Sequence, residues 1–241
     1  MRIPQTRSRR ITIAAVFAAL YFVLRSLPNP IPFLFQMVGI SGRFTAGDFI
    51  LTTVALVGGV WGGTLSVLVG TVLAYPVNGP VFFGLDFLPG VMNIAVTGLV
   101  LEDHRRIAQG IFITVLFMFL VSPYSLLFGF GYVPFVWLHI LALVVLLSPV
   151  VAIVPDWIVR NDSRQLLAIA ILAFVGTMAQ HLTGGLLYEM AVGVVEGNSP
   201  SVLMGYWRIV FWLYPLERVL LTIISTIISV GALRAIRRLG V

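Results

Sequence analysis

Long apolar runs constrain this chain more than any other feature of its sequence. The stretch from Asp48 to Tyr75 is apolar for 28 residues, and further apolar stretches cover residues 86–101, 107–122, 133–157, 165–193 and 208–233. A helix needs about 20 apolar residues to cross a bilayer. Only 10% of the 241 residues are charged, whereas soluble domains carry about 25%. The sequence therefore predicts an all-α, polytopic transmembrane helical bundle.

Two residue types are absent, and their absence removes several kinds of chemistry. The chain has no cysteine, which excludes disulfides, thiolate metal sites and a cysteine nucleophile. All 15 basic residues are arginine, so the chain cannot complete a GxxxxGK[ST] phosphate loop or a Ser–Lys dyad. It also lacks HExxH, CxxC and GxSxG motifs. We therefore expect no enzyme activity, no metal, no cofactor and no nucleotide hydrolysis.

The arginines predict how the chain is threaded through the membrane. Four clusters, at residues 2–10, 105–106, 160–164 and 234–238, hold eleven of the 15 arginines. Cytoplasmic loops carry an excess of basic residues. With a cytoplasmic N-terminus, all four clusters fall on that side only if the 48–75 stretch divides at Gly58–Gly63 into two short spans. The net charge of +6 then reflects topology, and we expect no nucleic-acid partner.

The resulting topology has eight spans in a single integral membrane domain, residues 1–241, with both termini in the cytoplasm and the protein in the cell membrane. The first apolar run follows arginines and precedes no small-residue cleavage site, so it is interpreted as an uncleaved span. Residues 28–47 form a Pro/Gly-rich loop expected at the membrane surface or over a cavity. The spans are expected at residues 11–27, 48–60, 62–77, 86–101, 107–122, 133–157, 165–193 and 208–233.

Small residues recur at helical spacing in two places. One set repeats every four residues through the second and third expected spans and favours internal packing over a partner interface, because small residues let helices approach closely in lipid. The first span contains two overlapping AxxxA pairs, which suit either internal packing or a partner. The first set is Gly58, Gly62, Ser66, Gly70 and Ala74. The second consists of the pairs Ala14/Ala18 and Ala15/Ala19.

Polar side chains inside a bilayer are costly, so each is a candidate functional residue. Asp86 and Asn93 are seven residues apart and share a helix face. Asp86 and Asp48 also stand at the start of a span, where an acid caps a helix N-terminus. His104 and His139 show no ligand spacing and are expected to be structural.

The seventh stretch holds the densest set of polar groups, Gln180, His181, Tyr188 and Glu189. The last three share one helix face with Gly185. They could bind a polar ligand, relay a proton or form an interhelical hydrogen-bond network.

The last span opens with aromatic residues that are typical interface anchors, Trp207, Trp212 and Tyr214. Glu217 and Arg218 lie deeper, and Arg218 is expected to pair with Glu189 or Asp86. The candidate substrate-binding residues are Asp48, Asp86, Asn93, Gln180, His181, Tyr188, Glu189, Glu217 and Arg218.

Several segments together resemble the substrate-binding (S) component of energy-coupling-factor transporters. These are the arginine-rich start leading into residues 14–19, a Pro/Phe-rich first loop, Gly47-Asp48, the glycine pattern of residues 58–70, and Phe87-Leu88-Pro89-Gly90-Val91-Met92-Asn93. Arg105-Arg106 and the arginine-rich C-terminus of the last helix complete the resemblance, which covers residues 10–125 and 208–238.

The resemblance implies a membrane subunit that captures a vitamin or cofactor precursor near the outer face under the first loop. It also implies that Ala14, Ala15, Ala18 and Ala19 dock on a transmembrane T subunit driven by two ATPase subunits. Two features depart from the family. We count eight spans where the family usually has six, and Met1-Arg2-Ile3 lacks the Met-x-His end of nickel and cobalt members.

Two other functions fit the sequence. A proton-coupled secondary carrier would use His181 and Glu189 as its coupling pair. A non-transport protein, such as a scaffold subunit of a membrane complex, would need none of these residues for chemistry.

Overall fold

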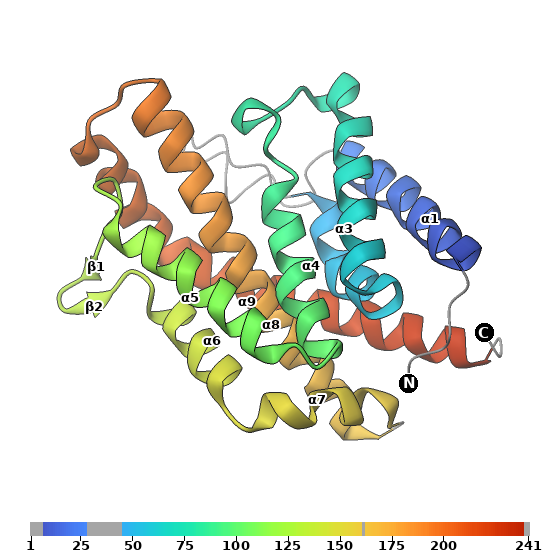
Figure 1. The fold of residues 1–241 in the computed structure, drawn as a ribbon. Helices are drawn as coiled ribbons and strands as arrows, with labels where there is room; N and C mark the ends of the chain where they lie inside the picture. Colours follow the sequence, from blue (N-terminus) through green and yellow to red (C-terminus); the bar gives the residue numbers. More distant parts are fainter. Residues whose placement is uncertain (1–6, 28–44, 161, 239–241) are drawn as a thin grey trace.

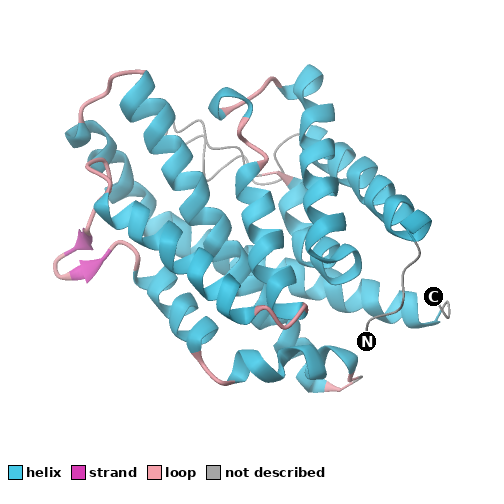
Figure 2. Ribbon diagram, in the orientation of Figure 1, coloured by secondary structure: helices cyan, strands magenta, loops and turns pink. Residues whose placement is uncertain are grey.

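Every apolar run of the sequence is helical in the computed structural model, which describes residues 7–27, 45–160 and 162–238 (Figures 1 and 2). Within these residues the fold is all-α except for one short hairpin. The helices are α1 (Arg7–Ser26), the 3-10 helix η1 (Ala46–Ile50), α3 (Leu51–Asn78), the 3-10 helix η2 (Phe82–Gly84), α4 (Leu88–Leu101), α5 (Arg105–Val121), α6 (Trp137–Leu147), α7 (Val150–Val159), α8 (Ser163–Tyr188), the π-helix η3 (Glu189–Val195) and α9 (Pro200–Arg238).

Three helical segments are long and apolar enough to cross a membrane, although the first of them is broken at Gly59. They are Ala46–Asn78, Ser163–Val195 and Pro200–Arg238, and α6 with α7 makes a fourth if that bent pair counts as one span. The count applies to the described residues and rests on length and composition. These long apolar helices are compatible with a membrane protein, and they are fewer than the eight spans expected.

The helix α3 reverses direction at Gly59. This residue has φ 65° and ψ −168°, a conformation that only glycine adopts readily. A Cβ on Gly63 would lie 3.5 Å from the Val54 side chain, although nine residues of straight helix rise about 13.5 Å. Leu51 and Val67, which lie on either side of Gly59 in the sequence, likewise both contact the position that a Cβ on Gly90 would take. Residues 51–58 and 60–78 therefore pack against each other as an antiparallel pair.

The Gly59 turn lies at the end of the bundle where α4 ends and α1 begins. The carboxylate of Glu102 accepts a hydrogen bond from the Val60 backbone N–H at 3.0 Å. Ile13 of α1 approaches the position of a Cβ on Gly58 to 3.9 Å. We call this the arginine end, because Arg105 and Arg106 follow Glu102 directly.

The C-terminal arginines contact the end of α7. The guanidinium of Arg237 donates to the carbonyl oxygens of Ile158, at 2.7 Å, and Arg160, at 3.2 Å. The arginine clusters at residues 160–164 and 234–238 are therefore neighbours. Figure 1 shows the first turn of α1 and the last turns of α9 at the same edge of the molecule.

The single span expected at residues 133–157 is two helices. Residues 133–134 belong to the hairpin, and α6 and α7 meet at a bend of 74°. The bend falls at Ser148-Pro149, because proline has no N–H to continue the backbone hydrogen bonds of α6. Gln109 of α5 holds this point by donating to the Leu146 carbonyl oxygen at 2.9 Å.

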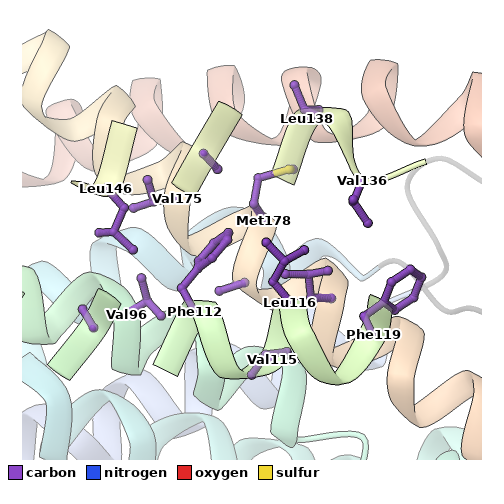
Figure 3. Packing of buried hydrophobic residues seen from close by; sticks show 14 of the residues in the cluster. Val96, Phe112, Val115, Leu116, Phe119, Val136, Leu138, Leu146, Val175 and Met178 are labelled. Carbon is purple, nitrogen blue, oxygen red and sulfur yellow. The ribbon is translucent and has the colours of Figure 1, made fainter. Parts of the chain in front are cut away.

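The main apolar core lies between α5, α6 and α8. Figure 3 shows side chains of this cluster, including Phe112 and Leu116 of α5 and Met178 of α8, gathered in one layer. Phe112 and Met178 have no solvent exposure. This layer fixes α8 in the middle of the bundle, where its polar side chains can contact α4 on one side and α9 on the other.

The small-residue stripe of residues 60–78 packs on α1 within the chain, as the internal-packing interpretation predicts. Ser66 donates to the Ala14 carbonyl oxygen at 3.1 Å, and a Cβ on Gly70 would lie 2.7 Å from the Ala18 carbonyl oxygen. Ala14 and Ala18 are consequently buried, at 4% and 5% exposure. Their expected place on a partner-docking face is therefore wrong.

Ala15 and Ala19 lie on the opposite, exposed face of α1. The two overlapping AxxxA pairs thus have different surroundings, one inside the chain and one on its surface.

A short hairpin, β1 (Phe128–Phe130) with β2 (Val133–Pro134), follows α5 and was not expected from the sequence. Its aromatic side chains point away from the core, and Tyr132 is 96% exposed. Phe130 contacts the exposed Trp212 of α9, with ring centroids 5.6 Å apart. An exposed, uncharged aromatic cluster of this kind suits a membrane–water interface.

Candidate functional site

A small hollow, with room for about one water molecule among the described residues, lies at the end of the bundle opposite the arginine end; we call it the pocket. Arg25 is twelve residues beyond Ile13 on α1, a rise of about 18 Å. The pocket is lined by Arg25, Thr45, Ala74, Tyr75, Asn78, Gly79, Val81 and Asp86. Its walls therefore come from α1, α3, the segment before η1 and the loop that leads into α4.

An ion pair forms one wall of the pocket. The Arg25 guanidinium and the Asp86 carboxylate are 2.6 Å apart, and the two side chains are 12% and 6% exposed. The second oxygen of Asp86, Oδ1, is buried. Arg25 therefore neutralises the Asp86 carboxylate in the pocket wall through a charge-assisted hydrogen bond.

The other polar lining residues are fixed by the backbone. The Tyr75 hydroxyl donates to the Gly84 carbonyl oxygen at 2.7 Å, and the Asn78 amide donates to the Arg25 carbonyl oxygen at 2.8 Å. These bonds tie the end of α3 to α1 and to the loop before α4. The polar residues of the pocket wall are therefore held in place by hydrogen bonds within the chain.

Thr45 joins the pocket to the centre of the bundle. It lines the pocket, and its backbone N–H and hydroxyl both donate to Asp48 Oδ2, at 2.8 and 3.1 Å. The Asp48 N–H in turn donates to the Thr45 carbonyl oxygen at 3.0 Å. Asp48 thus caps the start of η1 in a capping box, as the capping interpretation predicts.

A chain of side-chain hydrogen bonds, the polar ladder, continues from Asp48 through α8 to α4. The Gln180 side-chain amide donates to Asp48 Oδ1 at 2.6 Å, and the Asn93 side-chain amide donates to Gln180 Oε1 at 3.0 Å. Thr97 then donates to Asn93 Oδ1 at 3.4 Å. Close approach of the two helices permits this, because a Cβ on Gly176 would lie only 2.6 Å from Asn93 Oδ1.

The opposite side of α8 carries a histidine stack. His139 Nε2 of α6 and His181 Nδ1 of α8 are 2.9 Å apart and share one hydrogen. Tyr214 of α9 lies against both rings, with centroids 5.4 and 5.0 Å away. Its hydroxyl donates to the Phe135 carbonyl oxygen at 2.7 Å. A hydrogen bond between two imidazoles needs one of them to act as acceptor, so at least one is neutral.

Glu217 and Arg218 are buried one turn beyond Tyr214 on α9. The Arg218 guanidinium lies 3.9 Å from the Glu217 carboxylate. The expected pairing of Arg218 with Asp86 or Glu189 is wrong, because Asp86 pairs with Arg25 and Glu189 accepts hydrogen bonds from Ser125 and Trp207.

Glu189 marks a separate cluster two turns along α8 from His181. Its Oε1 accepts from the Ser125 hydroxyl at 2.9 Å and from Trp207 Nε1 at 3.1 Å. Tyr188 packs on Trp207 with ring centroids 5.6 Å apart. His181, Tyr188 and Glu189 thus face α9, as their spacing predicts, but they divide between two clusters.

The structure assigns different surroundings to several of the residues singled out from the sequence. Asp86 does not cap α4, which begins at Leu88 with Phe87 as its N-cap residue. Trp207 and Tyr214 are not interface anchors, since they are 5% and 0% exposed. Trp212, at 64% exposure, remains one.

Four residues near these clusters were not selected from the sequence. Arg25, Thr45 and Tyr75 line the pocket, and His139 bonds His181. Arg25 stands at the end of the first apolar run, which is the one signal that could have identified it. The Pro/Gly-rich first loop, residues 28–47, which was expected at the membrane surface or over a cavity, lies outside the described residues except for its last three.

Comparison with known proteins gives no match to any family model, curated sequence or solved structure. Among the described residues, no group of three or more His, Cys, Asp or Glu side chains is placed to hold a metal ion. The interpretation of the site therefore rests on its own geometry.

Proposed function

We propose that this chain is the membrane substrate-binding subunit of an energy-coupling-factor importer and captures a vitamin-like or cofactor-precursor-like small molecule. The observation that carries the proposal is the buried Arg25–Asp86 ion pair, which lines the small hollow at the end opposite the arginine clusters. Binding sites of this kind combine a few fixed polar groups with an otherwise apolar scaffold.

The polar ladder links this pocket to the interior. Thr45 touches both the pocket and Asp48, and Asp48 contacts Gln180 of the central helix α8. Occupation of the pocket would therefore act on a chain of hydrogen bonds that reaches α4. Such a chain is a route by which a bound solute could change how the helices sit together.

The proposed orientation places the arginine end in the cytoplasm, with both termini there, and the pocket at the outer face of the cell membrane. Eight membrane-embedded segments follow if residues 46–58 and 60–78 count separately and the bent α6–α7 pair counts once. The reversal at Gly59 and the contact between Glu102 and Val60 support this arrangement. The exposed aromatic hairpin then lies at the outer interface.

The energy for import must come from partner subunits, because the chain lacks a phosphate-binding loop. We propose a transmembrane T subunit and two ATPases as partners. The docking face on α1 is narrowed to the exposed pair Ala15 and Ala19, because Ala14 and Ala18 are covered by α3. Small exposed residues allow another helix to approach closely.

Mass spectrometry of small molecules that co-purify with the full chain tests the binding function. The compound found is then titrated against the wild type and against Asp86→Asn. Because a hydrogen bond to a charged group contributes about 1.5–3 kcal/mol, we expect affinity to fall at least about tenfold. The matched control is Asp156→Asn, the same chemical change at an exposed site on α7. Equal affinity of the Asp86 variant and the wild type would contradict this use of the pocket.

Co-purification with a T subunit tests the docking face separately. Ala15→Trp combined with Ala19→Trp should abolish co-purification and leave ligand binding intact. Phe117→Trp places the same side chain on an exposed position of α5 and should have no effect. If the double variant still binds the T subunit, docking uses another surface.

The His139–His181 hydrogen bond favours one further candidate function, a proton-coupled secondary carrier. Such a carrier would take up its solute in proteoliposomes that contain this chain alone and a pH gradient. Uptake that requires added ATPase subunits would exclude it.

A further inference from the structure

Glu189 is buried in an unusual local environment at the outer end of α8. It is 2% exposed and begins the π-helix η3, and π-helical turns often occur at functional sites. Its Oε2 is buried and has no hydrogen-bond partner among the described residues. This carboxyl group takes no part in the pocket or the polar ladder.

The hydrogen bonds around Glu189 have more acceptors than hydrogens. The Ser125 hydroxyl is within hydrogen-bonding distance of both Glu189 Oε1 and the Phe119 carbonyl oxygen. A hydroxyl carries one hydrogen and a carbonyl oxygen can only accept. Ser125 can therefore satisfy a carboxylate or the Phe119 carbonyl oxygen, but not both. A proton on Oε1 of Glu189 would remove the conflict, because it would donate to Ser125 and release the Ser125 hydrogen to Phe119.

No described cation neutralises Glu189. Within residues 7–27, 45–160 and 162–238, no ion pair includes Glu189; Arg25 pairs with Asp86, and Arg218 lies next to Glu217. The polar groups that face Glu189 are neutral. They are Ser122 and Ser125 from the segment after α5 and Trp207 from α9.

Two opposing effects act on the ionised form of Glu189. Burial of an unpaired carboxylate is costly in a low-dielectric interior. Hydrogen bonds from Ser125 and Trp207 offset part of that cost, but both act on Oε1, and Oε2 has none. Trp207 can keep donating in either state, because a protonated oxygen still has acceptor lone pairs.

We infer that Glu189 is a proton-binding site in which Ser125 acts as a switchable relay to the Phe119 carbonyl oxygen. In the ionised state the Ser125 O–H donates to Glu189 Oε1. When a proton from the adjacent aqueous phase binds Oε1, the new O–H donates to Ser125 and the Ser125 O–H turns to Phe119. One proton is gained, and only hydrogen-bond directions change within the protein. The inference needs no cargo and no partner, so it stands apart from the proposed function.

Infrared spectroscopy of the full chain in lipid nanodiscs tests the site directly, because a protonated carboxyl group has its own C=O stretch. We expect a carboxyl band that grows as pH is lowered and is lost in Glu189→Gln. Glu196→Gln, which alters an exposed acid at the end of the same helical segment, should leave the band in place. If the titrating bands of wild type and Glu189→Gln are identical, Glu189 does not bind a proton and the inference is wrong.

Ser125 is tested as a positioning residue by two variants. Ser125→Ala removes the relay and should shift the Glu189 band in frequency and in its pH midpoint, whereas Ser125→Thr keeps a hydroxyl and should restore both. If Glu189→Gln does not fold, isotope-labelled glutamate in the wild-type and Ser125 variants reports the same band. An unshifted band in Ser125→Ala would overturn the relay.

Discussion

The Arg25–Asp86 pair offers the sharpest test of how the pocket is held together. The two groups are 2.6 Å apart, and both side chains are largely buried. Removing one partner of a buried pair leaves the other charge without compensation and costs about 3–5 kcal/mol. For a chain of this length each kcal/mol moves Tm by about 2–4 °C. Arg25→Gln or Asp86→Asn should therefore lower Tm by about 6–20 °C. Because Arg25 keeps 12% exposure, water compensates part of the loss, and we expect the lower half of that range.

Thermal unfolding in lipid nanodiscs, followed by circular dichroism, measures this effect. The double variant Arg25→Gln with Asp86→Asn leaves no unpaired charge and should lose less stability than the sum of the single variants. Arg164→Gln, at an exposed position near the start of α8, controls for loss of a positive charge. Additive losses in the double variant would refute the reasoning, because they would mean that the two charges do not stabilise each other.

Three further substitutions test the fold around the site by the same unfolding measurement. Gly59→Ala should lower the free energy of unfolding by about 1–3 kcal/mol, since it places a side chain in a glycine-only conformation. The control Gly62→Ala should be near neutral, because nothing lies within 4 Å of the added Cβ. Gly70→Val should separate α1 from α3, because even a Cβ would lie 2.7 Å from the Ala18 carbonyl oxygen, and a variant as stable as the wild type would contradict the contact. Phe112→Ala should cost about 3–5 kcal/mol through the cavity it leaves in the core.

The helical segments could be predicted from the sequence because they coincide with local apolar runs. The placement of arginines also predicted a turn at Gly58–Gly63, and the chain reverses at Gly59. The bend at Ser148-Pro149 was missed because the apolar composition continues across it, and composition alone does not indicate direction.

The polar contacts could not be predicted in the same way. Asp48 and Gln180 are 132 positions apart, and His139 and His181 are 42 positions apart. Which residues meet depends on the rotation of each helix about its axis. That rotation is set by close contacts such as Gly176 on Asn93, which leave no periodic signal in a single sequence.

The alanine pairs of α1 illustrate the same limit. Ala14/Ala18 and Ala15/Ala19 have identical spacing and adjacent positions, yet only the first pair is buried. The spacing shows that a close helix contact is possible on two faces. Only the position of α3 decides which of them is used inside the chain.

The reversal at Gly59 also has a consequence for how far a solute must travel. Residues 46–58 rise only about 20 Å, whereas the hydrocarbon core of a bilayer is about 30 Å thick. With the Gly59 turn tied to Glu102 at one surface, the Asp48 end of this half-helix stops below the other. In the proposed orientation, Asp48 therefore lies about 10 Å inside the outer edge of the hydrocarbon core, and about 20 Å separates it from the cytoplasmic edge.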